Sequence, residues 1–209
     1  MEIAHKYRSE DVGILSDTHI GHANIIKYCD RPFTSVGEMD DRLIAAILEN
    51  DRQGKLLLHG GDIMFRGRVK LPPLKNAKYN VAVAGNHDEN LSDYTPWFGT
   101  IVGTQKTWRD NQFSLMIDDA LYVMSHNPQQ KLPHGARNLH GHVHNGPYNK
   151  VEYFITKGRD KDIHFIFDND DYINCCVEML DYTPRSIQYL EQQVNVPTVP
   201  VEYRHLLTK

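Results

Sequence analysis

Cysteine is scarce in this chain, and its placement excludes a disulfide-stabilised fold. Three cysteines occur among 209 residues, Cys29, Cys175 and Cys176, so the count is odd and two of them are adjacent. Small secreted domains that depend on disulfides carry dense and even-numbered cysteines instead. The sequence therefore predicts a reducing, cytoplasmic environment.

Long hydrophobic runs and an excess of positive charge are also missing. No apolar run approaches the roughly 18 residues that cross a bilayer, and the opening MEIAHKYRSEDVG lacks the apolar core of a signal peptide. With 23 Lys and Arg against 27 Asp and Glu, the formal net charge is −4. That balance gives no overall attraction to nucleic acid or anionic membranes. We expect no membrane contact, and recognition of any polyanion only at a local site.

Short apolar segments separated by turn residues predict a mixed α/β fold. Each is rich in β-branched or aliphatic residues and bounded by Gly, Asp, Asn or Pro, as strands are. The predicted strands are VGILS (12–16), KLLLHGG (55–61), YNVAVAG (79–85), SLMI (114–117), ALYVMS (120–125), HFIF (164–167) and INCCVEML (173–180). Helical spacing predicts one helix from a capping box at Ser35 and Glu38 to Asn50, and a shorter helix over 184–194.

No repeat, low-complexity tract or Gly/Ser linker interrupts the chain. We therefore expect one domain over residues 1–209, within which residues 195–209 form an extended tail because NVPTVPVEY carries two prolines.

Histidine is the abundant residue, with 12 copies, and histidines gather with Asp and Asn where the predicted strands end. The residues at these ends are Asp17 and His19, then Asp62, then Asn86, His87 and Asp88, and then His126. NLHGHVHNG adds His142 and His144, which are two apart and so can lie on one face of an extended segment. In layered α/β folds, ligands collect outside the carboxyl ends of the strands, so these side chains are expected to converge.

Apart from His87 and Asp88, the converging donors are two aspartates, one asparagine and four histidines. This set suits Zn, Mn or Fe(II) in an open catalytic site better than a calcium cage or a thiolate zinc site. Seven ligands exceed one tetrahedral ion and fit two ions if a carboxylate bridges them. Two ions about 3.5–4 Å apart can clamp the oxygens of an in-line phosphoryl displacement, and a hydroxide bridging them is a strong nucleophile. One such histidine would more often be structural, but the recurrence at five strand ends favours a metal site.

In this order the motifs resemble those of the calcineurin-like metallophosphoesterase superfamily. The five blocks are Asp17-Thr18-His19, Gly61-Asp62, Gly85-Asn86-His87-Asp88, Ser125-His126 and Gly141-His142-Val143-His144. All five in order are a specific signal, whereas G-N-H-D alone would be weak. SDTHIGHANIIKYCDRPF and INCCVEMLDYTPRSIQYL also resemble segments of a branch of small bacterial and phage phosphoesterases.

The resemblance implies a two-sheet β sandwich flanked by helices, with a dinuclear centre for which Mn is the favoured metal. It implies that Asp17, His19 and His144 hold the first ion, that Asp62 bridges, and that Asn86, His126 and His142 hold the second. It also implies that His87 is the general acid, kept charged and oriented by Asp88.

The surroundings of these motifs bear on the substrate. GDIMFRG half matches the G-D-x-x-D-R-G signature of protein serine/threonine phosphatases, but Phe65 replaces the acidic residue and disfavours that activity. Arg66 and His22 remain candidate phosphate contacts, with an ordinary loop position as the alternative for each. TPWFG (95–99) and Trp108 either wall the pocket or pack in the core.

We therefore expect a dinuclear-metal phosphohydrolase that acts on phosphodiesters or small phosphorylated molecules, nucleotides included. A protein or nucleotide phosphomonoesterase is the alternative. A metal-binding scaffold without catalysis is a remote one, since no ligand position is replaced. A nucleic-acid substrate is less favoured, because the five basic residues between Ile63 and His87 fit a solvated basic face.

Overall fold

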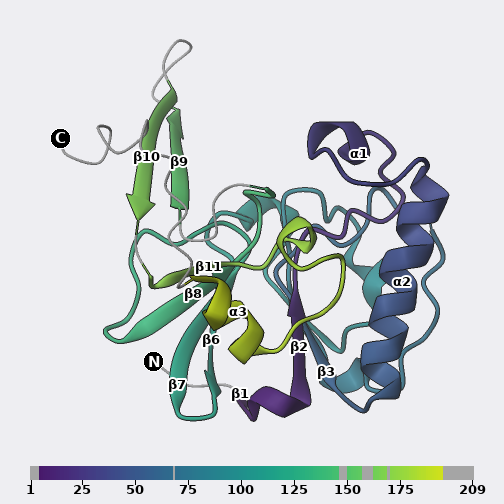
Figure 1. Cartoon of the computed structure of the whole chain (residues 1–209), viewed down its shortest axis with the longest axis horizontal. Coiled ribbons are helices and arrows are strands. Elements are labelled where there is room, and N and C mark those ends of the chain that lie inside the picture. The colour runs from purple at the N-terminus through teal and green to yellow at the C-terminus, as the bar shows by residue number, and fades with distance from the viewer. Residues whose placement is uncertain (1–4, 68, 146–149, 157–161, 169, 195–209) are drawn as a thin grey trace.

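Two sheets form the framework of the protein in the computed structural model (Figure 1). The structure describes residues 5–67, 69–145, 150–156, 162–168 and 170–194. The strands are β1 (His5–Tyr7), β2 (Val12–Leu15), β3 (Leu56–His59), β4 (Val81–Val83), β5 (Thr100–Val102), β6 (Gln112–Ile117), β7 (Ala120–Ser125), β8 (Ala136–His140), β9 (Lys150–Thr156), β10 (Asp162–Asp168) and β11 (Tyr172–Asn174). The α-helices are α1 (Ile25–Tyr28), α2 (Val36–Arg52) and α3 (Ile187–Val194). The 3-10 helices are η1 (Ser9–Asp11), η2 (Ala77–Tyr79), η3 (Leu91–Tyr94), η4 (Gln105–Thr107) and η5 (Val177–Met179).

The first sheet has four strands in the order β2-β3-β4-β5, and all of its pairs are parallel. The register places Val12 beside Leu56 and Leu58 beside Val81. β2 and β4 are buried throughout, and so is β3 after its first residue, because parallel strands are covered on both faces. All four strands consequently end at the same rim of the sheet.

Helix α2 packs against β3 at the side of this sheet (Figure 1). Met39, Leu43 and Ile47 recur at helical spacing and are buried. The predicted helix is thus confirmed and continues to Arg52. Its capping box is only half formed. The Ser35 hydroxyl accepts a bond from the Glu38 N–H at 3.2 Å, but the Glu38 carboxylate accepts from Thr34 instead.

The second sheet has five strands in the order β1-β6-β7-β8-β11. β7, β8 and β11 are parallel to one another, whereas β6 is antiparallel to β7. The apolar pattern of the sequence does not predict β8, because its segment ARNLH carries buried polar residues. Asn138 is fully buried, yet its amide donates to the Val123 carbonyl and its oxygen accepts from the Gln129 N–H, both at 2.8 Å. Satisfied hydrogen bonds replace the expected apolar alternation here.

The C-terminal segment departs from the predicted strand at 173–180. β11 stops at Asn174, whose side-chain oxygen accepts a bond from the Cys176 N–H at 2.9 Å, and η5 follows. α3 then begins inside the predicted helix 184–194 and touches β11 and β2. β9 and β10 form an antiparallel hairpin beside the five-stranded sheet (Figure 1), and HFIF lies in β10. The predicted tail at 195–209 lies outside the described residues.

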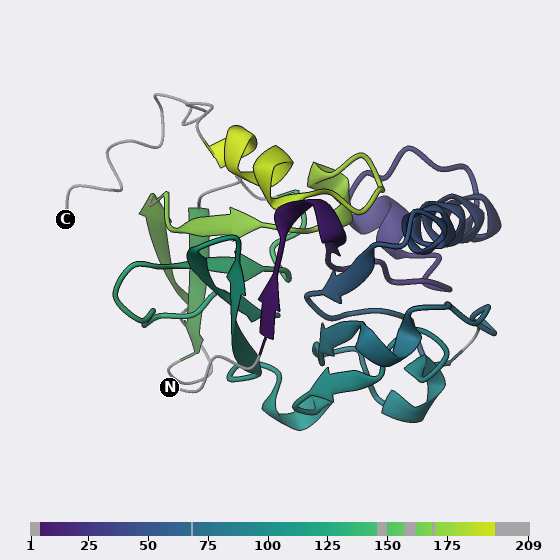
Figure 2. The same cartoon turned by 90° about the horizontal axis from the view of Figure 1, so that it is seen from below.

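The two sheets lie side by side and join where β2 and β11 end (Figure 2). Ser16 forms an isolated parallel bridge with Cys176, and the Val177 N–H donates to the Ser16 carbonyl at 3.1 Å. This mixed α/β arrangement of two sheets with flanking helices confirms the expected fold. Among the helices of the described residues, none is long and apolar enough to cross a membrane.

Candidate metal centre

The ends of five strands, taken from both sheets, bring the seven candidate ligands together. Asp17 and His19 follow β2, Asp62 follows β3, Asn86 follows β4, His126 follows β7, and His142 and His144 follow β8. Backbone hydrogen bonds tie the first two loops together, since the Asp17 N–H donates to the Gly61 carbonyl and the His19 N–H to the Asp62 carbonyl, both at 2.9 Å. Because His126, His142 and His144 follow strands of the five-stranded sheet, the site is complete only when both sheets are assembled.

Five of these seven residues have a left-handed backbone. The φ angles are 58° at Asp17, 51° at His19, 56° at Asp62, 71° at His142 and 48° at His144. A residue with a side chain pays about 1–3 kcal/mol for such a conformation, and proteins retain it mainly where a function requires it. This concentration marks the strand ends as a functional site independently of any motif.

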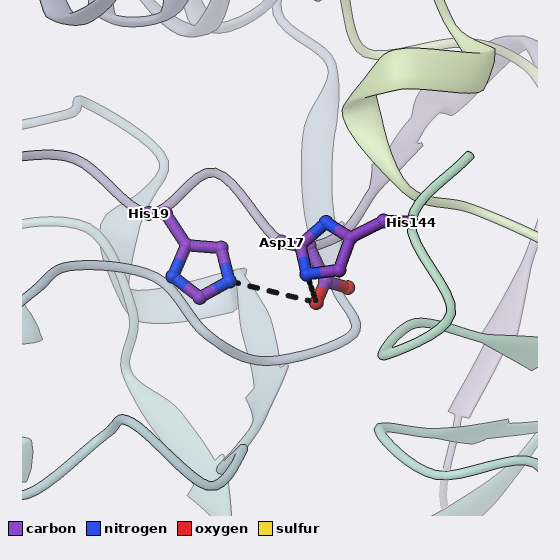
Figure 3. Close-up of side chains that lie close together, drawn as sticks. All are labelled: Asp17, His19 and His144. Carbon is purple, nitrogen blue, oxygen red and sulfur yellow. Dashed lines mark ion pairs between the residues drawn. The ribbon is translucent and has the colours of Figure 1, made fainter. Parts of the chain in front are cut away.

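Asp17, His19 and His144 form what we call the first pocket (Figure 3). Asp17 Oδ2 accepts bonds from the Ser16 hydroxyl at 2.5 Å, the His142 N–H at 3.0 Å and the Cys176 thiol at 3.4 Å. Asp17 Oδ1 instead faces the two rings, 3.8 Å from His19 Nε2 and 3.7 Å from His144 Nε2. The three donors on Oδ2 thus leave Oδ1 as the atom that points into the pocket.

Asn86, His126 and His142 form the second pocket. The Nδ1–H of His126 donates to the Gly60 carbonyl at 2.9 Å, so its Nε2 faces inward, 2.9 Å from Asn86 Oδ1. The His142 ring lies 5.1 Å from the His126 ring, centre to centre.

Asp62 lies between the two pockets. Its Oδ1 accepts a bond from the His87 N–H at 2.9 Å, and its Oδ2 is 3.4 Å from His19 Nε2 and 3.5 Å from His126 Nε2. One oxygen is therefore nearly equidistant from a ring of each side, as a bridging carboxylate would be.

Buried polar atoms without partners test whether metal ions fit this arrangement. Among the described residues, no hydrogen-bond partner reaches Asp17 Oδ1 or either ring nitrogen of His19, although both side chains are buried. Leaving such atoms unpaired is costly unless a ligand satisfies them. Ligand atoms lie within 4.8 Å of one another both in Asp17, His19 and His144 and in Asp17, Asp62 and His126. The donor set and its bare atoms fit divalent cations.

Electrostatics lead to the same conclusion. Burial raises the pKa of Asp62 to about 7, with Asp17 and Asp88 adding to the effect and His126 opposing it. Burial would also raise the pKa of Asp17, but His126, His144 and His19 hold it below its ordinary value. Burial lowers the pKa of His142 to about 3, which keeps that ring neutral. Burial would lower the pKa of His126 and His144, but the neighbouring carboxylates raise both. The buried carboxylates thus draw positive charge into the site, and a divalent cation can supply it in place of protons.

His87 lies beside the pockets, and its ring centre is 5.2 Å from that of His19. Burial and His126 lower its pKa, while the charge of Asp88 opposes that shift. Asp88 does not orient the His87 ring, contrary to expectation. Its carboxylate accepts three backbone N–H bonds at 2.8–2.9 Å, from Asp62, Ile63 and Gly85. Asp88 therefore holds two ligand loops together and reaches His87 only through its charge.

His22 and Arg66 end up in different surroundings. The His22 ring is buried, 5.4 Å from the His19 ring and 6.0 Å from the His87 ring, and it stacks on Phe65 at 4.1 Å with an 8° tilt. The exposed Arg66 lies beyond, with its guanidinium carbon 5.0 Å from the centre of the Phe65 ring. The structure thus brings His22 to the site and leaves Arg66 at the outer end of the stack.

One tryptophan packs in the core and the other lies against the site, so each of the two expected alternatives applies to one of them. Trp97 is fully buried and, like Phe98, belongs to the core. Trp108 is partly exposed and lies against the second pocket, 4.6 Å from the His142 ring and 5.7 Å from the His126 ring.

Sequence reasoning missed two residues of the site, Arg31 and Glu178. Glu178 accepts a bond from His144 Nδ1 at 3.0 Å, and Arg31 binds both Glu178 and the carbonyl of Asp17. The sequence pattern gives no signal for Glu178, because it predicts that this segment continues a strand. Arg31 was visible only within the stretch CDRPF.

Sequence similarity to known proteins agrees with this geometry. The sequence profile of the calcineurin-like phosphoesterases matches residues 11–156, which include all seven candidate ligands. The chain belongs to the calcineurin-like phosphoesterase family. This confirms the resemblance to the superfamily, and membership implies metal-dependent phosphoesterase activity on phosphorylated substrates.

Two similar proteins extend the comparison without adding a function. An uncharacterized protein of Methanocaldococcus jannaschii is 28% identical over 185 residues, which cover 85% of this chain and 87% of that protein. The crystal structure of a protein of unknown function from Aquifex aeolicus is similar with a TM-score of 0.54 and 20% identity, over 87% of this chain and 97% of the other. The second likeness supports the fold alone.

Proposed function

We propose that this calcineurin-like phosphoesterase is a dinuclear-metal phosphohydrolase that favours phosphodiesters or small phosphorylated molecules, nucleotides included. The observation that carries the proposal is the position of Asp62 Oδ2, which lies 3.4 Å from His19 Nε2 and 3.5 Å from His126 Nε2. In the same site, Asp17 Oδ1 is buried and has no hydrogen-bond partner among the described residues. Asp17, His19 and His144 would hold the first ion, Asn86, His126 and His142 the second, and Asp62 would bridge. Mn is the favoured metal, with Fe and Zn as the other candidates.

Bound divalent ions would activate water at neutral pH and neutralise charge on the phosphoryl oxygens. The chain's own residues do the rest. His87 is assigned the proton transfer to the leaving oxygen, since it borders both His19 and His22 without belonging to the ligand set. Its lowered pKa makes its protonated form a stronger acid than a free histidine.

His22 is assigned a contact with the substrate phosphate. Stacking on Phe65 fixes its ring within 6.0 Å of the His87 ring, so both histidines border the same space. Arg66 is assigned a weaker and outer role, because it is exposed and reaches the site only along this stack.

We also propose that residues 1–209 act as one domain in the cytoplasm. Glu178 supports the first point, because it lies beyond the family match at 11–156 and still contacts His144. The second point is supported by three buried free cysteines.

Hydrolysis of a chromogenic bis-ester and of the matching mono-ester tests the proposal. Metal-free protein should be inactive, and reloading with Mn²⁺ should restore hydrolysis, faster on the bis-ester. Faster hydrolysis of the mono-ester would identify a phosphomonoesterase instead. Two bound ions per chain without hydrolysis of either ester would favour a scaffold and overturn the proposal.

A further inference from the structure

Arg31 and Glu178 form a buried ion pair next to the first pocket. Their side chains are 0% and 4% exposed, and Arg31 Nη2 lies 2.7 Å from Glu178 Oε1. Arg31 Nε donates to the same oxygen at 2.9 Å. Buried ion pairs contribute little net stability, because desolvation offsets their attraction. A pair retained in this position therefore calls for an explanation other than stability.

Two further donors of Arg31 bind the loop that carries Asp17, and a third binds Met39 Sδ in α2 at 3.3 Å. Nη2 donates to the Asp17 carbonyl at 2.7 Å and Nη1 to the Thr18 carbonyl at 2.9 Å. This loop has the left-handed φ of 58° at Asp17. The planar guanidinium thus fixes the two carbonyls at the point where the backbone is strained, and with them the direction of the Asp17 carboxylate.

Glu178 orients the other ligand of the same pocket. Its Oε1 accepts the Nδ1–H of His144 at 3.0 Å, which directs His144 Nε2 toward Asp17 Oδ1, 3.7 Å away. A carboxylate on the far nitrogen of a ligand histidine fixes its tautomer and makes it a stronger ligand. In the second pocket, the corresponding partner of a ligand histidine is uncharged, because the Nδ1–H of His126 donates to the Gly60 carbonyl.

Cys29, His144 and Glu178 also offer ligand atoms within 4.8 Å of one another. The Arg31 guanidinium, bonded to the same Glu178 oxygen, repels a cation there. The pair therefore favours orientation of His144 over binding of a third ion.

We propose that Arg31 and Glu178 are a positioning pair that sets the metal affinity of the first pocket and leaves that of the second unchanged. The inference rests on the proposed dinuclear centre. It assigns the two pockets different affinities that respond to different residues.

Titration of metal-free protein with Mn²⁺, followed by the EPR signal of free Mn²⁺, tests this inference. Glu178→Gln should weaken one of the two affinities by about 10- to 100-fold and leave the other within about twofold. Arg31→Lys keeps the charge but loses the planar fork, and should weaken the same affinity less. The matched control is Glu191→Gln, which removes a carboxylate bound to Arg137 at 2.6 Å and to the Tyr122 hydroxyl, and should change neither affinity.

The outcomes separate the inference from the proposed function. Wild-type protein that binds no Mn²⁺ would refute the dinuclear centre itself. Two ions in the wild type, with both affinities unchanged or equally weakened in Glu178→Gln, would refute the positioning pair alone. Thermal melting of the metal-free variants records their folding, and loss of the fold in both would make the pair structural and overturn its positioning role.

Discussion

The two metal pockets differ in what orders their ligands. In the first pocket a charged pair orders the ligands, since Glu178 binds His144 and Arg31 binds the carbonyl of Asp17. The second is held by a neutral carbonyl and by the partly exposed Trp108 ring against His142. Buried charged groups that bind the ligands fix their geometry before the ion binds, whereas neutral and more exposed groups fix it less firmly. The comparison predicts which changes affect one pocket, both or neither.

Asp62→Asn should have the largest effect, because this carboxylate belongs to both pockets. Loss of the bridging charge should remove both ions and reduce kcat/KM by about 10³-fold or more, since the ions supply several kcal/mol of transition-state stabilisation. Metal analysis together with hydrolysis assays measures both. His142→Ala is the contrast and should lose the second ion alone. Full activity in metal-loaded Asp62→Asn protein would refute the bridging role.

His87→Ala should leave both pockets intact and still slow the reaction. The ring lies 5.2 Å from His19, but it is outside the ligand set, so the metal content should remain at two ions. We expect kcat to fall by about 10²-fold, the scale of a lost general acid. Parallel metal analysis decides the assignment, because loss of an ion would make His87 a ligand.

Gly141→Ala should disturb the first pocket through its geometry. A Cβ at Gly141 would collide with Asp17 Oδ2 and the Ser16 hydroxyl, which are the atoms that aim the carboxylate. We expect the first affinity for Mn²⁺ to fall by about 10- to 100-fold, with a stability loss of about 1–3 kcal/mol.

Gly37→Ala provides the matched control for that variant. Apart from its chain neighbours and the backbone of α2, no atom lies within 4 Å of its added Cβ. Metal affinity should therefore stay constant, while stability rises slightly because alanine suits a helix better than glycine. A normal first affinity in Gly141→Ala would show that the close approach is not required.

The sequence reveals the ligands better than the residues that orient them, for a physical reason. Five of the ligands follow a short apolar strand, and His142 and His144 stand two apart in the motif Gly141-His142-Val143-His144. Both are local patterns that can be recognised without knowing the fold. Glu178 meets Arg31 across 147 residues, and only because β11 stops at Asn174 and the chain turns into η5. That turn depends on a hydrogen bond to the Asn174 side chain, and the apolar pattern of INCCVEML gives no indication of it.

The same reasoning explains which parts of the fold were missed. The buried strands of the four-stranded sheet read as apolar runs, so β2, β3 and β4 were predicted and were found. The strands β5 and β8 were not predicted. β5 has only three residues, and β8 contains Asn138, whose burial depends on partners in β7 and in the loop that follows β7. Tertiary hydrogen bonds, not local preference, decide such a strand.

His22→Ala should have the smallest effect and concerns neither pocket directly. The His22 ring stacks on Phe65 and borders His87, so its loss should remove a phosphate contact while both ions remain. A hydrogen bond to a charged group contributes at least about 1.5 kcal/mol, so kcat/KM should fall by at least about tenfold. The exposed loop residue His134 provides the control, because His134→Ala should change nothing. Unchanged kinetics in His22→Ala would reduce His22 to a packing residue beneath the substrate, and the charge that recognises the phosphate would then come from the metal ions alone.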